Sequence, residues 1–291
     1  MNGIIIVDKP AGWTSHDVVA KLRGALKVKR VGHGGTLDPM ATGVLVVFVG
    51  TATGAAQFSE AADKEYIASL RAGIVTDTQD ITGNILSQHE ASVTPEAISA
   101  VFKNFTGEQK QTPPMYSALK HKGKKLYELA RKGIEVERQA RDISIYEIKL
   151  INSIENEHSF IVKCSKGTYI RTLCHDIGAA LGCGAAMSSL RRTASGRYRI
   201  DMARSMDDIL NLINQKSYDE LLLQTDTIFS EYPKLQLTED DVKRSKNGQS
   251  CMLREEEDNK YRVYDHEGKF MLFGQIIEGE LKKIKAFYGS N

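Results

Sequence analysis

Residues 32–49 read GHGGTLDPMATGVLVVFV, and this stretch determines how the rest of the chain is interpreted. Its last part, Val44–Val49, is a continuous β-branched and aromatic run that predicts a strand buried on both faces. Gly32, Gly34 and Gly35 in the loop before it allow backbone geometry that other residues avoid. Pro39 disfavours helical φ/ψ at Asp38. We therefore expect Asp38 to be held extended on a rigid loop that leads into a buried strand, a common location for active-site residues.

Two other interpretations of this loop remain open at this point. Asp38 could be a turn aspartate that bonds its own backbone. The glycines could instead cradle a phosphate. The loop has no Gly-Lys-Ser/Thr ending and leads into a predicted strand, so a P-loop of a nucleotide-binding enzyme is disfavoured.

Strands and helices are mixed along the rest of the chain without βαβ regularity, which favours the α+β class. Ser15 is the expected N-cap of the first helix, which we expect to continue to Leu26. The other expected helices are 94–105, 124–132 and 169–181, and the other expected strands are 4–7, 66–74, 143–151 and 160–164. After a linker at 231–233, short strands at 251–253, 261–264 and 270–273 predict a small β-rich domain.

Composition is ordinary for a globular protein of 291 residues, with 41% hydrophobic and 26% charged residues. No apolar run approaches the ~18–20 residues of a membrane span, and we see no signal peptide, so we expect a cytoplasmic protein. The four cysteines form no C-x-x-C pair or common zinc spacing. They predict buried thiols in a reducing compartment and no metal site.

Basic residues are concentrated in two stretches of a chain whose net charge is only +2. Lys120–Arg141 has eight Lys/Arg against three Glu, and Lys163–Arg199 has seven against one acid. Such clusters indicate a polyanion such as RNA, although solvated helix faces would give the same pattern.

Residues 32–43 closely resemble the catalytic motif of the bacterial tRNA pseudouridine-55 synthases, the TruB family. Further segments resemble that family's motifs and occur in its order: Asp8–Ser15, Lys64–Tyr66, Thr112–Ala118, Cys164–Thr172 and Leu190–Arg192. The resemblance implies a pseudouridine-synthase fold, with a mixed, mainly antiparallel sheet flanked by helices. It also implies isomerisation of uridine to pseudouridine at position 55 in the T loop of tRNA.

Asp38 matches the family's essential aspartate. The reaction breaks the bond between ribose C1′ and uracil N1, turns the base over and joins C1′ to C5. Substrate and product contain the same atoms, so the resemblance implies no cofactor. The carboxylate could attack C1′ covalently or accept a ribose proton, and the sequence does not distinguish these routes.

The resemblance also assigns roles to five other residues. Arg171 matches the arginine that pairs with the aspartate, and Tyr66 matches a tyrosine that stacks on the target base. Tyr169 and Leu190 match positions that line the base pocket, and His33 matches a histidine near the displaced nucleotides. By spacing alone, Arg171 would be a helix-surface residue, and the two tyrosines and Leu190 would be packing residues.

The family's organisation predicts a catalytic domain at 1–230, with an RNA-gripping insertion at about 84–141, and a PUA-like RNA-binding domain at 231–291. The expected partner is the T arm of tRNA, bound by a monomer without a membrane or a small-molecule cofactor. The competing hypothesis is a non-catalytic RNA-binding or tRNA-folding protein, because the basic stretches fit both. Asp38 with Arg171 and Tyr66 favours the enzyme, since binding alone requires no acid beside a phosphate-rich ligand.

Overall fold

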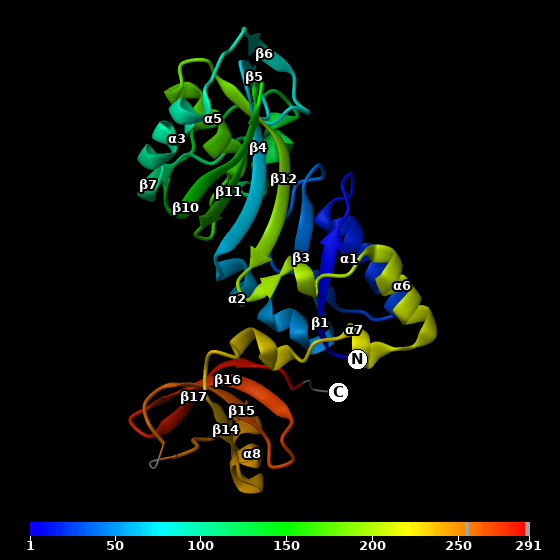
Figure 1. Cartoon of the computed structure of the whole chain (residues 1–291). Helices are drawn as coiled ribbons and strands as arrows, with labels where there is room; N and C mark the ends of the chain where they lie inside the picture. Colours follow the sequence, from blue (N-terminus) through cyan, green and yellow to red (C-terminus); the bar gives the residue numbers. More distant parts are fainter. Residues whose placement is uncertain (254–255, 289–291) are drawn as a thin grey trace. The chain divides into compact units, whose positions relative to one another are not determined.

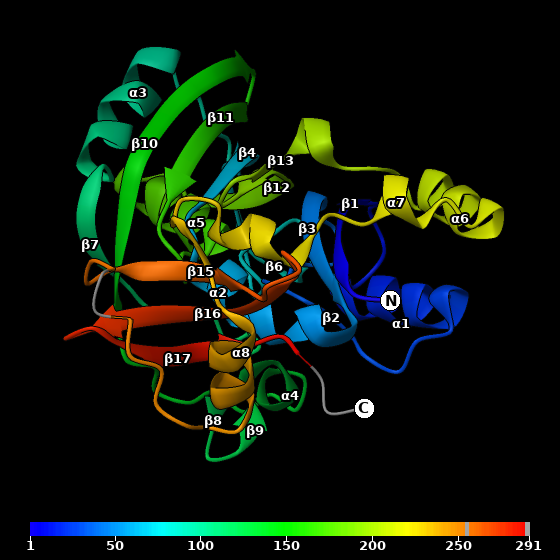
Figure 2. The ribbon, with the colours of Figure 1, turned by 90° about the horizontal axis from the view of Figure 1, so that it is seen from below.

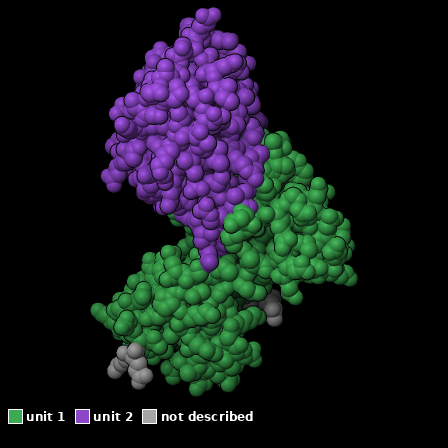
Figure 3. Space-filling view, in the orientation of Figure 1, with its two compact units in different colours: residues 1–39, 45–61, 201–291 green, residues 40–44, 62–200 purple. Residues whose placement is uncertain are grey.

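The computed structural model describes residues 1–253 and 256–288 of the chain. It divides into two compact units (Figure 3). Unit 1 contains Met1–Pro39, Leu45–Ala61 and Asp201–Asn291, and unit 2 contains Met40–Val44 and Ala62–Ile200. Residues 254–255 and 289–291 of the predicted C-terminal domain lie outside the described residues.

Unit 2 is built on long antiparallel strands, visible in Figure 1. Their order in the sheet is β12 (Ala185–Ser195), β4 (Lys64–Ala72), β11 (Glu157–Cys164), β10 (Arg141–Ile154) and β7 (Gly107–Gln111). The start of β3 (Thr42–Val49) pairs in parallel with β12, with Thr42 opposite Arg191. The mixed, mainly antiparallel sheet expected from the sequence is therefore confirmed.

Helices cover one face of this sheet. Helix α5 (Ile170–Ala180) packs on β12 and β4, and α3 (Pro95–Asn104) packs on β10. Phe102 of α3 contacts Phe160 of β11, with ring centroids 5.2 Å apart. Side chains alternate between the two faces of a strand, so the residues in register with Phe160 on neighbouring strands also point toward the helices.

Unit 2 also contains several smaller elements. Strands β5 (Ile74–Thr76) and β6 (Ile85–Gln88) form a hairpin, as do β8 (Lys120–His121) and β9 (Lys124–Lys125). The helix predicted at 124–132 is shorter, because Lys124 and Lys125 pair as a strand and α4 spans only Leu126–Ala130. Strand β13 (Tyr198–Arg199) pairs with the end of β12.

Unit 1 contains the N-terminal elements of the chain. They are β1 (Gly3–Lys9), α1 (Ser15–Leu26), β2 (Val31–His33), the 3-10 helix η1 (Gly50–Ala55) and α2 (Ala56–Ala61). Strand β2 pairs antiparallel with β3, and Val31 lies opposite Val49. The prediction for Val44–Val49 is confirmed, since all six side chains are fully buried. The later elements include η2 (Ile200–Met202), α6 (Met206–Gln215), α7 (Tyr218–Leu221) and η3 (Thr225–Phe229).

The C-terminal part of unit 1 is a four-stranded sheet, seen beside α8 in Figure 2. Its order is β14 (Lys234–Gln236), β15 (Lys260–Tyr264), β16 (Phe270–Ile277) and β17 (Glu280–Ala286). The expected β-rich region is thus confirmed, but the strand predicted at 251–253 is wrong. Only Met252 makes an isolated bridge there, to Glu280. Helix α8 (Glu239–Lys246) was not predicted, because Val242 is its only buried apolar residue and no helical periodicity results.

An aromatic cluster joins this sheet to earlier elements of unit 1. Phe229 of η3 stacks on Phe273 of β16, with centroids 4.3 Å apart and planes 12° apart. Phe58 of α2 meets both rings edge-on, at 4.9 Å from Phe229 and 5.7 Å from Phe273. Aromatic pairs of this geometry contribute about 0.5–1.5 kcal/mol each beyond their buried area. The C-terminal sheet therefore shares its core with α2 and η3.

Three of the four cysteines are buried. Cys164, Cys174 and Cys251 are buried, as expected, whereas Cys183 is only half-buried, contrary to that expectation. Burial raises the pKa of the Cys164 thiol to about 12. Among the described residues, no group of three or more His, Cys, Asp or Glu is arranged to hold a metal ion. No helix within these residues has the length and apolar character needed to span a membrane.

Candidate active site

The glycine loop of unit 1 approaches helix α2 so closely that residue 34 must lack a side chain. The Gly34 N–H donates to the Val46 carbonyl at 2.9 Å, and the Ser59 hydroxyl donates to the Gly34 carbonyl at 3.2 Å. A Cβ placed on Gly34 would lie 2.4 Å from Cβ of Ser59 and 2.9 Å from the ring of Phe48. The loop is therefore packed directly against α2 and β3.

The two neighbours of Asp38 are both anchored. The Ser15 hydroxyl accepts the Leu37 N–H at 2.9 Å and donates to the Leu37 carbonyl at 3.2 Å. The Pro39 carbonyl accepts the Gly12 N–H at 2.8 Å and a hydrogen bond from Lys9 Nζ at 3.3 Å. Asp38 itself is half-buried. As expected, the loop that carries Asp38 leads into a buried strand, and the residues on both sides of Asp38 are anchored by hydrogen bonds.

The cap of α1 differs from the prediction. Thr14, not Ser15, is the N-cap: its hydroxyl accepts the Asp17 N–H at 3.0 Å, and the Asp17 carboxylate accepts the Thr14 N–H at 2.8 Å. Hydrogen bonds from the Thr14 side chain and backbone lower the pKa of Asp17. Two adjacent hydroxyl residues were equally suited to cap the helix. Because Thr14 does so, the Ser15 hydroxyl is available to Leu37.

His33, at the end of β2, packs edge-on against His16 in the first turn of α1. Their ring centroids lie 5.6 Å apart, with planes inclined by 72°. The two histidines and the anchored Asp38 loop all belong to unit 1. The other four predicted site residues belong to unit 2.

Tyr66 and Leu190 lie on the same face of the sheet in unit 2. Tyr66 on β4 is opposite Arg192 on β12, and Leu190 precedes Arg192 by two residues. Leu190 is also in register with Ala68, the partner of Phe160, so this is the face that α3 and α5 cover. Each of the two predicted pocket residues is only 8% exposed. Tyr169 is half-buried at the N-cap of α5, which packs on these two strands.

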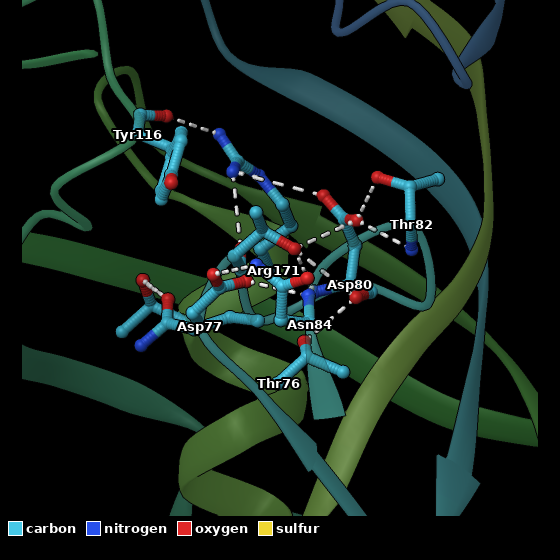
Figure 4. A network of polar contacts seen from close by, with 10 residues as sticks. Thr76, Asp77, Asp80, Thr82, Asn84, Tyr116 and Arg171 are labelled. Carbon is cyan, nitrogen blue, oxygen red and sulfur yellow. Dashed lines mark hydrogen bonds and ion pairs between the residues drawn. The ribbon is translucent and has the colours of Figure 1, made fainter. Parts of the chain in front are cut away.

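Arg171 is buried in the first turn of α5, rather than lying on the helix surface. Its Nη1 donates to the Thr78 carbonyl at 3.1 Å, and its Nη2 donates to the Tyr116 carbonyl at 2.6 Å (Figure 4). Nη1 also lies 3.7 Å from the Asp80 carboxylate. The guanidinium is therefore fixed within unit 2 by two different segments of chain.

Asp80 is a functional candidate that the sequence reasoning missed. Its Oδ1 accepts hydrogen bonds from the Thr82 N–H at 2.9 Å, the Thr82 hydroxyl at 2.5 Å and the Thr78 hydroxyl at 3.0 Å (Figure 4). Asp77 closes the same loop by accepting the Asn84 N–H at 2.9 Å. The signal was the Thr- and Asp-rich segment 76–84 between two strands, which is typical of a loop stapled by side-chain hydrogen bonds.

Gln111 is a second missed residue, and it holds the predicted base-pocket residue Tyr169. Its Oε1 accepts the Tyr169 N–H at 2.8 Å, and its Nε2 donates to the Tyr169 carbonyl at 3.1 Å. The N-cap of α5 has no side-chain capping bond of its own. Gln111, at the end of β7, and the Tyr116 carbonyl therefore connect residues 111–116 to Tyr169 and Arg171.

Much of the basic stretch that begins at Lys120 is exposed. Lys120, Lys122, Lys124, Arg131 and Lys132 are exposed to solvent on β8, β9 and α4 or just beyond them. Tyr127 has two cations near its ring, Lys125 at 5.4 Å and Arg131 at 5.5 Å. The arrangement provides positive charge beside an aromatic side chain, which is a combination suited to RNA.

Comparison with protein families gives two matches. The model of the TruB family pseudouridylate synthase N-terminal domain matches residues 23–170. The model of the tRNA pseudouridylate synthase B C-terminal domain matches residues 171–230.

Curated proteins and solved structures agree with these matches. The chain is 42% identical to the tRNA pseudouridine synthase B of Clostridium kluyveri, over 99% of this chain and all of that protein (100%). It is 51% identical to that of Alkaliphilus oremlandii over 78% of this chain and 75% of the relative. Among solved structures, a chain of a Cbf5-Nop10-Gar1 complex superposes with a TM-score of 0.76 at 26% identity, covering 98% of this chain and 85% of that one.

Proposed function

The chain belongs to the TruB family of pseudouridylate synthases, and from this premise we propose that it isomerises uridine to pseudouridine at position 55 of tRNA. A relative named tRNA pseudouridine synthase B is similar to this chain over 99% of its length. The structural observation that supports the proposal is the half-buried Asp38, held on a loop anchored at both neighbouring residues.

Asp38 is the proposed catalytic carboxylate. The C1′–N1 bond of the target uridine breaks, the uracil turns, the C1′–C5 bond forms, and the hydrogen on C5 leaves as a proton. The reaction needs no net oxidation, reduction or group transfer. A carboxylate serves it either as a nucleophile toward C1′ or as a base toward a ribose proton.

The remaining site residues are proposed from the resemblance of their segments to the family. Arg171 acts with Asp38, since a nearby cation favours the ionised carboxylate. Tyr66 stacks on the target base, which contributes about 1–3 kcal/mol and offsets the few kcal/mol needed to flip the base out of the T loop. Tyr169 and Leu190 line the base pocket, and His33 contacts the displaced nucleotides.

The proposed substrate contacts extend beyond the pocket. The exposed lysines of β8 and β9, within the insertion at about 84–141, bind phosphates of the T arm. The domain at 231–291 is proposed to bind RNA as a PUA-like module, and the enzyme to act as a cytoplasmic monomer. Each phosphate contact releases counterions, so affinity for tRNA falls steeply as the salt concentration rises.

The test is release of tritium from an unmodified tRNA transcript labelled at uridine C5. Joining C1′ to C5 expels that hydrogen, so release measures the isomerisation directly. We expect stoichiometric release by the wild type and none by Asp38→Asn. Asp142→Asn, which alters an exposed carboxylate on β10, is the matched control and retains activity.

Binding measurements on the same variants separate the enzyme from the competing binding module. Asp38→Asn should keep salt-sensitive affinity for tRNA. If the wild type binds tRNA tightly and releases no tritium, the isomerase proposal fails for this substrate and a binding or tRNA-folding function takes its place.

A further inference from the structure

The Ser15 hydroxyl both donates to and accepts from one residue that is distant in sequence. A serine hydroxyl has one donor and two acceptor lone pairs, so it can do both at once. Ser15 donates to the Leu37 carbonyl and accepts the Leu37 N–H, at 3.2 Å and 2.9 Å. Ser15 is only 1% exposed, and it lies 22 residues from Leu37 in the sequence. These bonds are shielded from water, so the loop is held by contacts that solvent does not readily replace.

The Leu37 carbonyl belongs to the same planar peptide unit as the nitrogen of Asp38. Fixing that carbonyl therefore also fixes the orientation of the peptide plane that contains the Asp38 nitrogen. On the other side, the Pro39 carbonyl is held by the Gly12 N–H at 2.8 Å and by Lys9 Nζ at 3.3 Å. The proline ring restricts its own φ. Between the two anchored carbonyls, only φ and ψ of Asp38 and ψ of Pro39 remain soft.

The support for Ser15 is itself rigid. Ser15 is the first residue of α1, and the capping box formed by Thr14 and Asp17 does not use the Ser15 hydroxyl. Val18 and Leu22 anchor the helix, since both are fully buried. Rigid elements hold catalytic groups more precisely than loops do. Ser15 thus connects the loop of Asp38 to an independently stabilised helix.

We propose that Ser15 is a positioning residue for Asp38, setting the orientation of the catalytic carboxylate through the Leu37 backbone. The inference rests on the proposed isomerase function, and it assigns a role to a residue outside the proposed substrate pocket. Ser15 acts on the geometry of the reacting carboxylate and contacts no RNA in this role. Its loss should therefore lower kcat and leave KM for tRNA unchanged.

The experiment compares Ser15→Ala with Thr14→Ala in the tritium-release assay. Both variants remove a hydroxyl at the start of α1, but only Ser15→Ala frees Leu37. Because a 1 Å displacement of a catalytic group can cost about 100-fold, we expect kcat of Ser15→Ala to fall by about 10- to 100-fold. Thr14→Ala should lose thermal stability, as a lost N-cap does, and keep kcat within about twofold.

Amide hydrogen exchange at Leu37 supplies a readout besides activity. Exchange should accelerate in Ser15→Ala and stay unchanged in Thr14→Ala. If Ser15→Ala does not fold, Ser15→Cys keeps the size of the side chain with a weaker donor, and its kcat should fall while its KM is unchanged.

Three results would overturn the inference: faster Leu37 exchange with wild-type kcat, a rise in KM instead of a fall in kcat, or equal losses of kcat in the serine and threonine variants. A wild type that releases no tritium would instead refute the proposed function.

Discussion

Arg171 and Asp80 form a buried ion pair, in which Nη1 of the arginine lies 3.7 Å from Oδ2 of the aspartate. Their side chains are 6% and 7% exposed. The aspartate is held by Thr78 and Thr82, and the arginine by the carbonyls of Thr78 and Tyr116. The pair therefore fixes the guanidinium that we propose acts with Asp38.

Asp80→Asn should lower both stability and turnover. The substitution keeps an oxygen for Thr82 but removes the charge opposite Arg171. We expect the free energy of unfolding to fall by about 1–3 kcal/mol, and kcat to fall at least tenfold, corresponding to about 1.4 kcal/mol. Tritium release and urea unfolding measure the two effects. Asp77→Asn is the control, because its carboxylate bonds Asn84 in the same loop; equal kcat values for both variants would exclude a specific role for the pair.

Gln111→Met should impair the site through Tyr169. Methionine matches the length of glutamine but makes neither hydrogen bond to the Tyr169 backbone. We expect kcat/KM to fall and the free energy of unfolding to drop by about 1–3 kcal/mol, the cost of leaving a buried polar group unsatisfied. Gln109→Met is a matched control on the same strand, since Gln109 donates to the Phe105 carbonyl at 2.6 Å and not to Tyr169. If both variants lost kcat/KM equally, the contact with Tyr169 would have no special importance.

Gly34→Ala should destabilise the protein because the added Cβ would overlap Ser59 and Phe48. Overpacking of this kind typically costs about 1–3 kcal/mol. Ser59→Gly removes the nearest atoms, so the double variant Gly34→Ala/Ser59→Gly should be more stable than the sum of the single effects predicts. Urea unfolding of the four proteins gives the coupling free energy. If the losses of unfolding free energy in the two single variants simply added in the double variant, Gly34 and Ser59 would not be in tight contact.

His158 should make stability sensitive to acid. It is fully buried, its Nδ1 lies 2.8 Å from the Ser153 hydroxyl, and burial lowers its pKa below the ordinary 6.5, with the charge of Glu157 acting in the opposite direction. The unfolded chain therefore binds a proton more readily, so this contribution to stability is present above pH 6.5 and is lost as the pH falls below it.

Unfolding free energies at about pH 7.5 and about pH 5 measure this effect. The decrease between them should be smaller in His158→Gln than in the wild type. The exposed His89 provides the control, since His89→Gln should retain the wild-type decrease. A decrease of the same size in His158→Gln would contradict the assignment.

Local patterns were sufficient for the main elements of the fold. The apolar run Val44–Val49 and the helical periodicity before Gly182 predicted β3 and α5, because burial of a whole strand or of one helix face leaves a direct signal in sequence. Helix α8 left no such signal, since it buries only Val242.

The site was predictable where its residues belong to a recognisable motif and not where they act on a partner that is distant in the sequence. Asp38, Tyr66 and Arg171 were named from motifs. Gln111 and Asp80 were not, because their partners lie 58 and 91 residues away. Gln111 bonds the backbone of Tyr169, which places little restriction on the identity of either residue. Asp80 pairs with the Arg171 side chain, but no local pattern in the sequence connects two residues so far apart. Ser15 was identified, but for a cap that Thr14 provides.

Two adjacent residues of helix α2 make contacts with different parts of unit 1. Phe58 packs in the aromatic cluster of the C-terminal sheet, and the Ser59 hydroxyl donates a hydrogen bond to the Gly34 carbonyl of the glycine loop. A chain truncated before Lys234 would leave the rings of Phe58 and Phe229 without Phe273. Such a truncation would thus also perturb the packing of the glycine loop that carries Asp38, in addition to removing the RNA contacts proposed for this region. For an engineer or for evolution, the C-terminal region is consequently difficult to delete or exchange unless α2 is redesigned with it.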